Sequence, residues 1–231
     1  MTTTTIRAFS LTACVALAAC GGGGASAPVI PSVTAPPAPG LIAFVGDSIT
    51  AGSRLPDNPS GITNPDALSP TAYPFLVGQA LGVPIVDLGI GGEIAFGAVA
   101  DEVPKVPLNA ATVVIYLGTN GVTFGGQNAG SVQNAENGES AVIAAVRARV
   151  PNACVLLIGL PDPLPWNIVM KPYIDAYDTF LTTLGLPILD LRTQAWTQNG
   201  ANFVEGVHPN VQGNADLAVS VESFLSAQRC L

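Results

Sequence analysis

Five short runs of apolar residues recur along the chain from residue 41 onward, and the first four end directly before a glycine. Their apolar residues are continuous rather than alternating with polar ones, which is typical of strands buried on both faces of a parallel sheet. The fifth run is the weakest of the set. The predicted strands are residues 41–45, 84–88, 112–117, 154–158 and 186–190.

Segments with helical patterning lie between these runs, and one more follows the last of them. The predicted helices are residues 72–81, 131–150, 173–184 and 213–228. Strands that alternate with helices predict an α/β fold, here a flavodoxin-like three-layer α/β/α sandwich with a five-stranded parallel sheet in the order 2-1-3-4-5. In such folds the ligand site lies just beyond the carboxyl ends of the strands.

Composition and charge exclude several classes of partner and metal site for this chain. Of the 231 residues, 48% are hydrophobic and only 10% are charged, so the chain can bury a sizeable core. Its net charge of -8 argues against nucleic acid as a partner, because an acidic chain releases no counterions from phosphates. With four cysteines, no CxxC motif and one histidine, the chain cannot form a zinc site of the usual Cys/His kind.

The amino-terminal segment reads as a targeting signal, and we predict a signal peptide over residues 1–19. Arg7 precedes the apolar residues 8–19, which are too few to span a bilayer comfortably. The run ends in Leu-Ala-Ala-Cys at 17–20, which resembles the lipobox of bacterial lipoproteins and implies a lipid on Cys20. Two alternatives are an ordinary cleaved signal, in which Cys20 is incidental, and a box that ends at Cys14.

The following residues 20–40 are almost wholly Gly, Ala, Pro, Ser, Val and Thr, a composition suited to a flexible and extended tether. A segment without any role is the alternative. We therefore expect a domain over residues 41–231, held by lipid on a bacterial cell envelope. Gly21 directly after Cys20 resembles lipoproteins that are sent to the outer membrane.

Candidate chemistry begins with Ser48, which directly follows the first predicted strand. Its hydroxyl needs a base to become a nucleophile, and His208 is the only histidine of the chain. His208 lies in a loop flanked by glycine and proline, which weakens a purely structural role. The alternative for Ser48 is a turn that caps the next helix.

Three further features complete a possible acyl-transfer site. Glu205 precedes the histidine by three residues, a spacing that on a turn lets a carboxylate reach the imidazole Nδ1; a solvated surface acid is the alternative. Asn120 follows the third strand and the Gly-Ile-Gly-Gly segment at 89–92 follows the second, where an amide and a backbone N–H could stabilise an oxyanion. Alone, each of these two has a plain turn interpretation.

Together these segments resemble the SGNH hydrolase family, also called the GDSL esterases. The four matching blocks appear in order at residues 46–50, 87–93, 118–120 and 205–209. The resemblance implies that Ser48 is the nucleophile, that His208 is its base, and that Ser48, Gly92 and Asn120 form the oxyanion hole. Three positions depart from the family pattern, because Glu205, Asp87 and Gly121 stand where the family usually has Asp, Asn and an acid.

The resemblance predicts hydrolysis of carboxylic esters through an acyl-enzyme, by a monomer that needs neither a metal nor an organic cofactor. A carbohydrate O-deacetylase and a lysophospholipase are narrower alternatives, and Trp166 and Trp196 could stack on a sugar or simply pack. A surface binding protein that has lost catalysis through Glu205 is the alternative from another class.

Two cysteines remain for the folded domain. Cys154 opens the fourth strand and Cys230 ends the last helix, so a disulfide between them could fasten the carboxyl terminus to the sheet. Such a bond requires export to an oxidising compartment. Two free thiols are the alternative.

Overall fold

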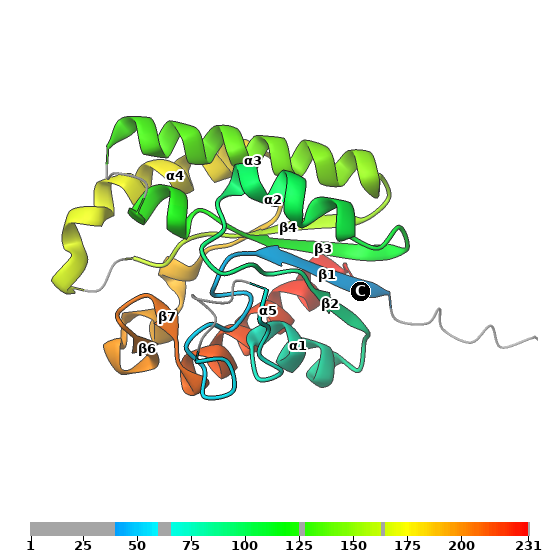
Figure 1. The fold of residues 1–231 in the computed structure, drawn as a ribbon, viewed down its shortest axis with the longest axis horizontal. Coiled ribbons are helices and arrows are strands. Elements are labelled where there is room, and N and C mark those ends of the chain that lie inside the picture. The colour runs from blue at the N-terminus through cyan, green and yellow to red at the C-terminus, as the bar shows by residue number, and fades with distance from the viewer. Residues whose placement is uncertain (1–39, 60–65, 125–127, 163–164, 231) are drawn as a thin grey trace, which may run out of the picture. The chain divides into compact units, whose positions relative to one another are not determined.

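The computed structural model describes residues 40–59, 66–124, 128–162 and 165–230. Within this part of the chain, five parallel strands form one sheet in the order β2-β1-β3-β4-β5 (Figure 1). The strands are β1 (Leu41–Gly46), β2 (Ile85–Asp87), β3 (Ala110–Tyr116), β4 (Cys154–Ile158) and β5 (Ile188–Leu189). The predicted fold class and strand order are both confirmed.

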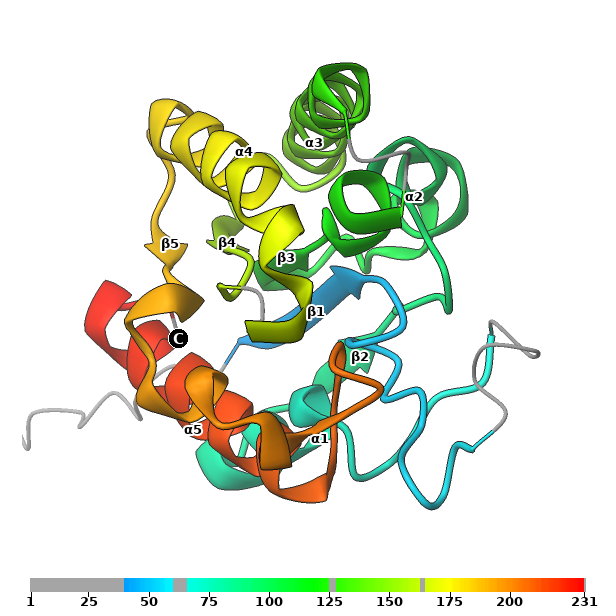
Figure 2. The ribbon, with the colours of Figure 1, turned by 90° about the vertical axis from the view of Figure 1, so that its left-hand side faces the viewer.

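Helices cover both faces of this sheet. They are α1 (Tyr73–Leu81), α2 (Ala95–Asp101), α3 (Ala129–Arg149), α4 (Lys171–Thr183) and α5 (Val211–Gln228). Figure 2 shows α1 and α5 against one face and α2, α3 and α4 against the other, which is the predicted three-layer arrangement.

The central strands are apolar on both faces because both faces carry helices. In β1 the side chains from Ile42 to Val45 are at most 1% exposed, and β3 is equally buried from Val113 onward. The parallel register pairs Phe44 of β1 with Asp87 of β2 on one side and with Val114 of β3 on the other. This pairing aligns the carboxyl ends of the three strands at one edge of the sheet.

Several elements were not expected from the sequence. Helix α2 has seven residues and no side-chain cap at its start, so it lacks the usual helix signals. A π-helix, η2 (Thr119–Phe124), follows β3, and a two-stranded antiparallel sheet pairs β6 (Phe203–Val204) with β7 (His208–Pro209). Strand β5 is also shorter than predicted, at two residues. Five short 3-10 turns fill other connections: η1 (Val103–Lys105), η3 (Pro165–Met170), η4 (Leu191–Thr193), η5 (Ala195–Gln198) and η6 (Gly200–Asn202).

A disulfide joins Cys154 to Cys230, whose Cα atoms lie 5.8 Å apart. It fastens the end of the chain to the start of β4, and the hydroxyl of Thr112 in β3 donates a hydrogen bond to the carbonyl oxygen of Cys230. The structure therefore contains the bond that the sequence left open.

The predicted signal peptide, Cys20 and the tether as far as residue 39 lie outside the described residues, so these predictions stay predictions. Among the residues that are described, no helix has the length and apolar character needed to cross a membrane.

Candidate functional site

Three loops meet at the carboxyl edge of the sheet. Strand β1 ends at Gly46, opposite Tyr116 of β3, and the backbone N–H of Ile90 donates a 3.0 Å hydrogen bond to the Gly46 carbonyl. A Cβ on Gly89 would lie 2.5 Å from the backbone nitrogen of Ala51, so only glycine permits this close approach. The segments that carry Ser48, Gly92 and Asn120 are thereby brought to one place.

Ser48 and His208 are in direct contact. The Ser48 Oγ lies 3.0 Å from the His208 Nε2, although 160 residues separate them in the sequence. Both side chains are buried, and His208 is held by the β6–β7 hairpin. Burial lowers the pKa of His208 below its usual 6.5, and this effect outweighs the opposing influence of Glu205. At neutral pH the imidazole is therefore uncharged and able to accept a proton.

Glu205 lies in the tight turn that connects β6 to β7. The turn is closed by a hydrogen bond from the Val207 N–H to the Val204 carbonyl, and both of its central residues, Glu205 and Gly206, have positive φ. The Glu205 Oε2 is 3.9 Å from the His208 Nδ1, beyond hydrogen-bond distance. That buried nitrogen has no hydrogen-bond partner among the described residues. The structure thus brings Glu205 beside the histidine without joining the two.

The three predicted oxyanion donors lie on the loops that follow β1, β2 and β3. No hydrogen bond occupies the backbone N–H groups of Ser48 and Gly92 within the described part of the chain, and Gly92 has a φ of +81°. The Asn120 side-chain nitrogen donates to the Glu93 carbonyl at 2.8 Å and, more weakly, to the Asp47 carboxyl at 3.4 Å. The first of these bonds fixes the amide, and the longer second one leaves an N–H that a substrate could take.

Two buried carboxyl groups support the serine loop, and no sequence pattern marks them as site residues. Asp47 is fully buried and accepts a 2.9 Å hydrogen bond from the Ile49 N–H. Glu102 reaches back from the end of α2 to accept a 2.7 Å bond from the Gly46 N–H. Burial raises the pKa of Asp47 to about 7 and that of Glu102 to about 9. Glu102 lies 56 residues from its partner, so no local pattern could reveal it.

An apolar pocket opens beside Ser48, between the serine loop and the β6–β7 hairpin. It is lined by Ile49, Thr119, Thr123, Leu160, Pro161, Asp162, Met170, Ile174, Phe203, Gly206 and Val207. Asn120 lines a second pocket together with Ile94 and Phe96, which expose about half of their side chains. Residues close to Ser48 and Gly92 in the sequence, Ile49 and Ile94, thus line one pocket each.

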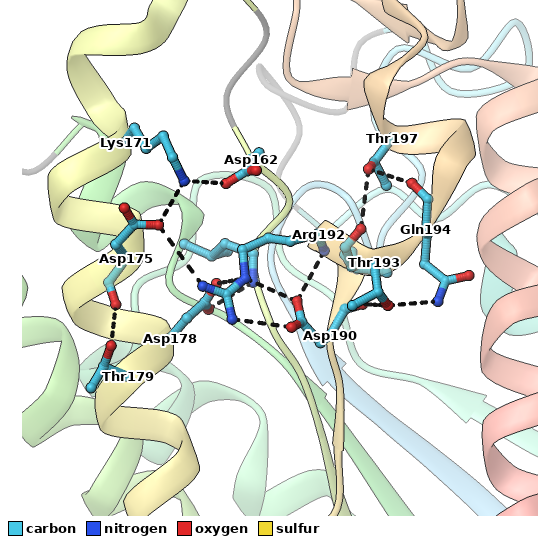
Figure 3. Close-up of polar contacts among 12 residues, drawn as sticks. Asp162, Lys171, Asp175, Asp178, Thr179, Asp190, Arg192, Thr193, Gln194 and Thr197 are labelled. Atoms are coloured by element: carbon cyan, nitrogen blue, oxygen red, sulfur yellow. Dashed lines mark hydrogen bonds and ion pairs between the residues drawn. The ribbon is translucent and has the colours of Figure 1, made fainter.

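A network of ion pairs adjoins the apolar pocket at Asp162. Lys171 binds Asp162, which lines the pocket, and also Asp175, each at 2.9 Å (Figure 3). Arg192 extends this network to the buried Asp178, with 3.1 Å between the Arg192 Nε and the Asp178 Oδ2. Desolvation raises the pKa of Asp178 to about 7, and the Arg192 guanidinium acts in the opposite direction.

Among the described residues, no group of acidic, cysteine or histidine side chains is suited to a metal ion.

Comparison with known proteins finds one matching family model and several solved structures with a similar fold. A family model described as the GDSL-like lipase/acylhydrolase family matches residues 44–215. A phospholipase A1 from Streptomyces albidoflavus NA297 has a similar fold, with a TM-score of 0.62 at 16% identity over 81% of this chain and 98% of the other. An extracellular lipase from Streptomyces rimosus gives 0.62 at 16% identity over 82% and 99% of the two chains. An acetyl xylan esterase, AlAXEase, gives 0.58 at 20% identity over 79% and 98%. None of the curated proteins compared with the chain matches its sequence.

Proposed function

Because the chain belongs to the GDSL-like lipase/acylhydrolase family, we propose that it is a serine esterase that hydrolyses carboxylic esters through an acyl-enzyme. The 3.0 Å contact between the Ser48 Oγ and the His208 Nε2 carries this proposal. A serine hydroxyl becomes a nucleophile only when a base can take its proton, and an uncharged, buried imidazole at this distance is such a base.

The proposed reaction has two symmetrical halves. The Ser48 Oγ attacks the ester carbonyl while its proton passes to the His208 Nε2, and the carbonyl oxygen becomes an oxyanion held by the N–H groups of Ser48, Gly92 and Asn120. The intermediate then collapses, and the leaving alcohol takes the proton from His208. Water next attacks the acyl-enzyme, again giving its proton to His208, and the acid is released as Ser48 regains a proton. Each oxyanion donor typically contributes about 3–4 kcal/mol to such a barrier.

The lining of the apolar pocket favours an ester whose acyl group has a chain of several carbons. Most of its lining side chains are apolar, so each buried methylene of a substrate contributes about 0.8 kcal/mol to binding. A role for tryptophan rings in stacking on a sugar substrate has less support. Trp196 stacks on Phe203 with ring centroids 5.9 Å apart and donates its indole N–H to Ser220, so it serves packing. The side chain of Trp166 lies outside the described residues.

We expect the full chain to hydrolyse p-nitrophenyl esters, with kcat/KM rising from the acetyl ester to esters of medium chain length. We also expect the acid limb of the pH profile to lie below pH 6.5, because the lowered pKa keeps His208 uncharged there. Protonation at still lower pH removes the base, so activity falls. A higher kcat/KM on acetylated sugars than on esters of medium chain length would contradict the proposed substrate. An acid limb above pH 6.5 would contradict the role of His208.

We further propose that Cys20 carries a lipid that holds the domain on the cell envelope. The Leu-Ala-Ala-Cys sequence at 17–20 and the Gly/Pro-rich residues after it support this proposal. In cells supplied with a labelled fatty acid, the wild-type chain and the Cys14→Ser variant should incorporate the label. The Cys20→Ser variant should not. Label that is retained in Cys20→Ser would refute the assignment.

A further inference from the structure

Arg54 forms an ion pair at the edge of the proposed site. It lies in the loop that follows Ser48, and its Nε donates a 3.2 Å hydrogen bond to the Glu205 Oε2. The same oxygen is the one that lies 3.9 Å from the His208 Nδ1. A single carboxylate oxygen therefore stands between a guanidinium and the imidazole, and it is bonded only to the former.

The backbone holds both partners of this pair in an unusual conformation. Three non-glycine residues of the described chain have positive φ, and two of them are Arg54 at +74° and Glu205 at +56°. The third, Arg229, ends helix α5, where a left-handed residue is common. Such conformations are unfavourable for residues with a Cβ and cluster at sites where geometry serves a purpose.

We propose that Arg54 is a positioning residue that holds the Glu205 carboxylate away from the His208 Nδ1 and so limits how strongly the imidazole accepts the Ser48 proton. This inference rests on the proposed function. Glutamate is long enough for its carboxylate to swing between the two partners, so the position of the carboxylate depends on which of them competes better. The ion pair also joins the loop of the nucleophile to the hairpin of the base.

The charges around His208 agree with this assignment. Glu205 favours the protonated imidazole, and Arg54 opposes it, so the two partners act on the histidine with opposite signs. The Arg54 Nε is no more than about 7 Å from the His208 Nδ1, given the two distances through Glu205. Asp47, which precedes Ser48, instead accepts hydrogen bonds from the Ile49 N–H and the Asn120 amide.

The chain offers an unusually direct test, because His208 is its only histidine. In untagged full chain with carbon-13-labelled histidine, a single imidazole signal reports the pKa of His208 by NMR. We expect Arg54→Gln to raise that pKa by about half a unit to one unit, since it removes a nearby positive charge and releases the carboxylate. Arg54→Lys keeps the charge and should shift the pKa less. The acid limb of kcat/KM should move with the NMR value in each variant.

Glu205→Gln separates positioning from simple charge repulsion. It should lower the His208 pKa, and the shift caused by Arg54→Gln should be smaller in the Glu205→Gln background, where no carboxylate can be released. An unchanged pKa in folded Arg54→Gln would overturn the proposal, and so would an equal shift in both backgrounds. If Arg54→Gln does not fold, as judged by thermal melting, comparison of Arg54→Lys in the two backgrounds decides between the same outcomes. The NMR titration needs no turnover, so a chain without esterase activity would refute the proposed function and leave this test intact.

Discussion

Replacing Ser48 with alanine is expected to remove ester hydrolysis almost completely, with a loss of about 10⁴- to 10⁶-fold in kcat. Without the hydroxyl, no acyl-enzyme can form, and among the described residues His208 is the only hydrogen-bond partner of this Oγ. The fold should persist, because the serine side chain is small and the loop is held by the bonds of Asp47 and Glu102. Initial rates on a medium-chain ester, together with thermal melting, test this expectation.

Ser53 provides a matched control. It lies five residues further along the same loop, is equally buried, and its Oγ has no hydrogen-bond partner within the described residues. Ser53→Ala should therefore keep the wild-type rate. If Ser48→Ala turned over esters as fast as Ser53→Ala, the nucleophile would have to be another group.

Loss of the Cys154–Cys230 disulfide is expected to lower the free energy of unfolding by about 4 kcal/mol, because the bond closes a loop of 76 residues in the unfolded chain. For a domain of this size, that corresponds to a fall in melting temperature of about 8–16 °C. The variant in which both cysteines are replaced by serine tests this, and its melting is compared with that of the oxidised wild-type chain.

Reductant supplies the control for this second prediction. It should lower the melting temperature of the wild-type chain and leave that of the double variant unchanged. Cys154 opens β4 and lies at the amino ends of the strands, away from Ser48, so kcat/KM at 25 °C should be the same with and without the bond. Equal melting temperatures of oxidised wild type and double variant would show that the bond does not stabilise the domain.

The strands and the proposed catalytic residues were predictable for one physical reason. Strands that are buried on both faces must be continuously apolar, so β1, β3 and β4 stand out, and the residues directly after them mark the edge where ligands bind. Ser48 and Asn120 occupy such positions, and the single histidine left no choice of base. The contact between Ser48 and His208 is a tertiary consequence of that topology.

The features that the sequence did not predict depend on partners far along the chain. Glu102 supports the Gly46 N–H across 56 residues, and Arg54 binds Glu205 across 151. Neither residue lies in a motif or shows a helical or strand periodicity that would distinguish it from a surface charge. Helix α2 escaped prediction because it is short and has no side-chain cap at its start, so it depends on packing, chiefly against α3.

The most direct test of the account is labelling of the folded full chain with an alkyl phosphonate that carries a good leaving group, followed by mass spectrometry of its peptides. A phosphonate reacts only with a serine that is activated by a base, beside donors that hold the new oxyanion. We expect a single adduct on Ser48 in the wild-type chain and in Ser53→Ala, and none in Ser48→Ala. Folded wild-type chain that remains unlabelled would contradict it and would favour a binding protein built on the same fold.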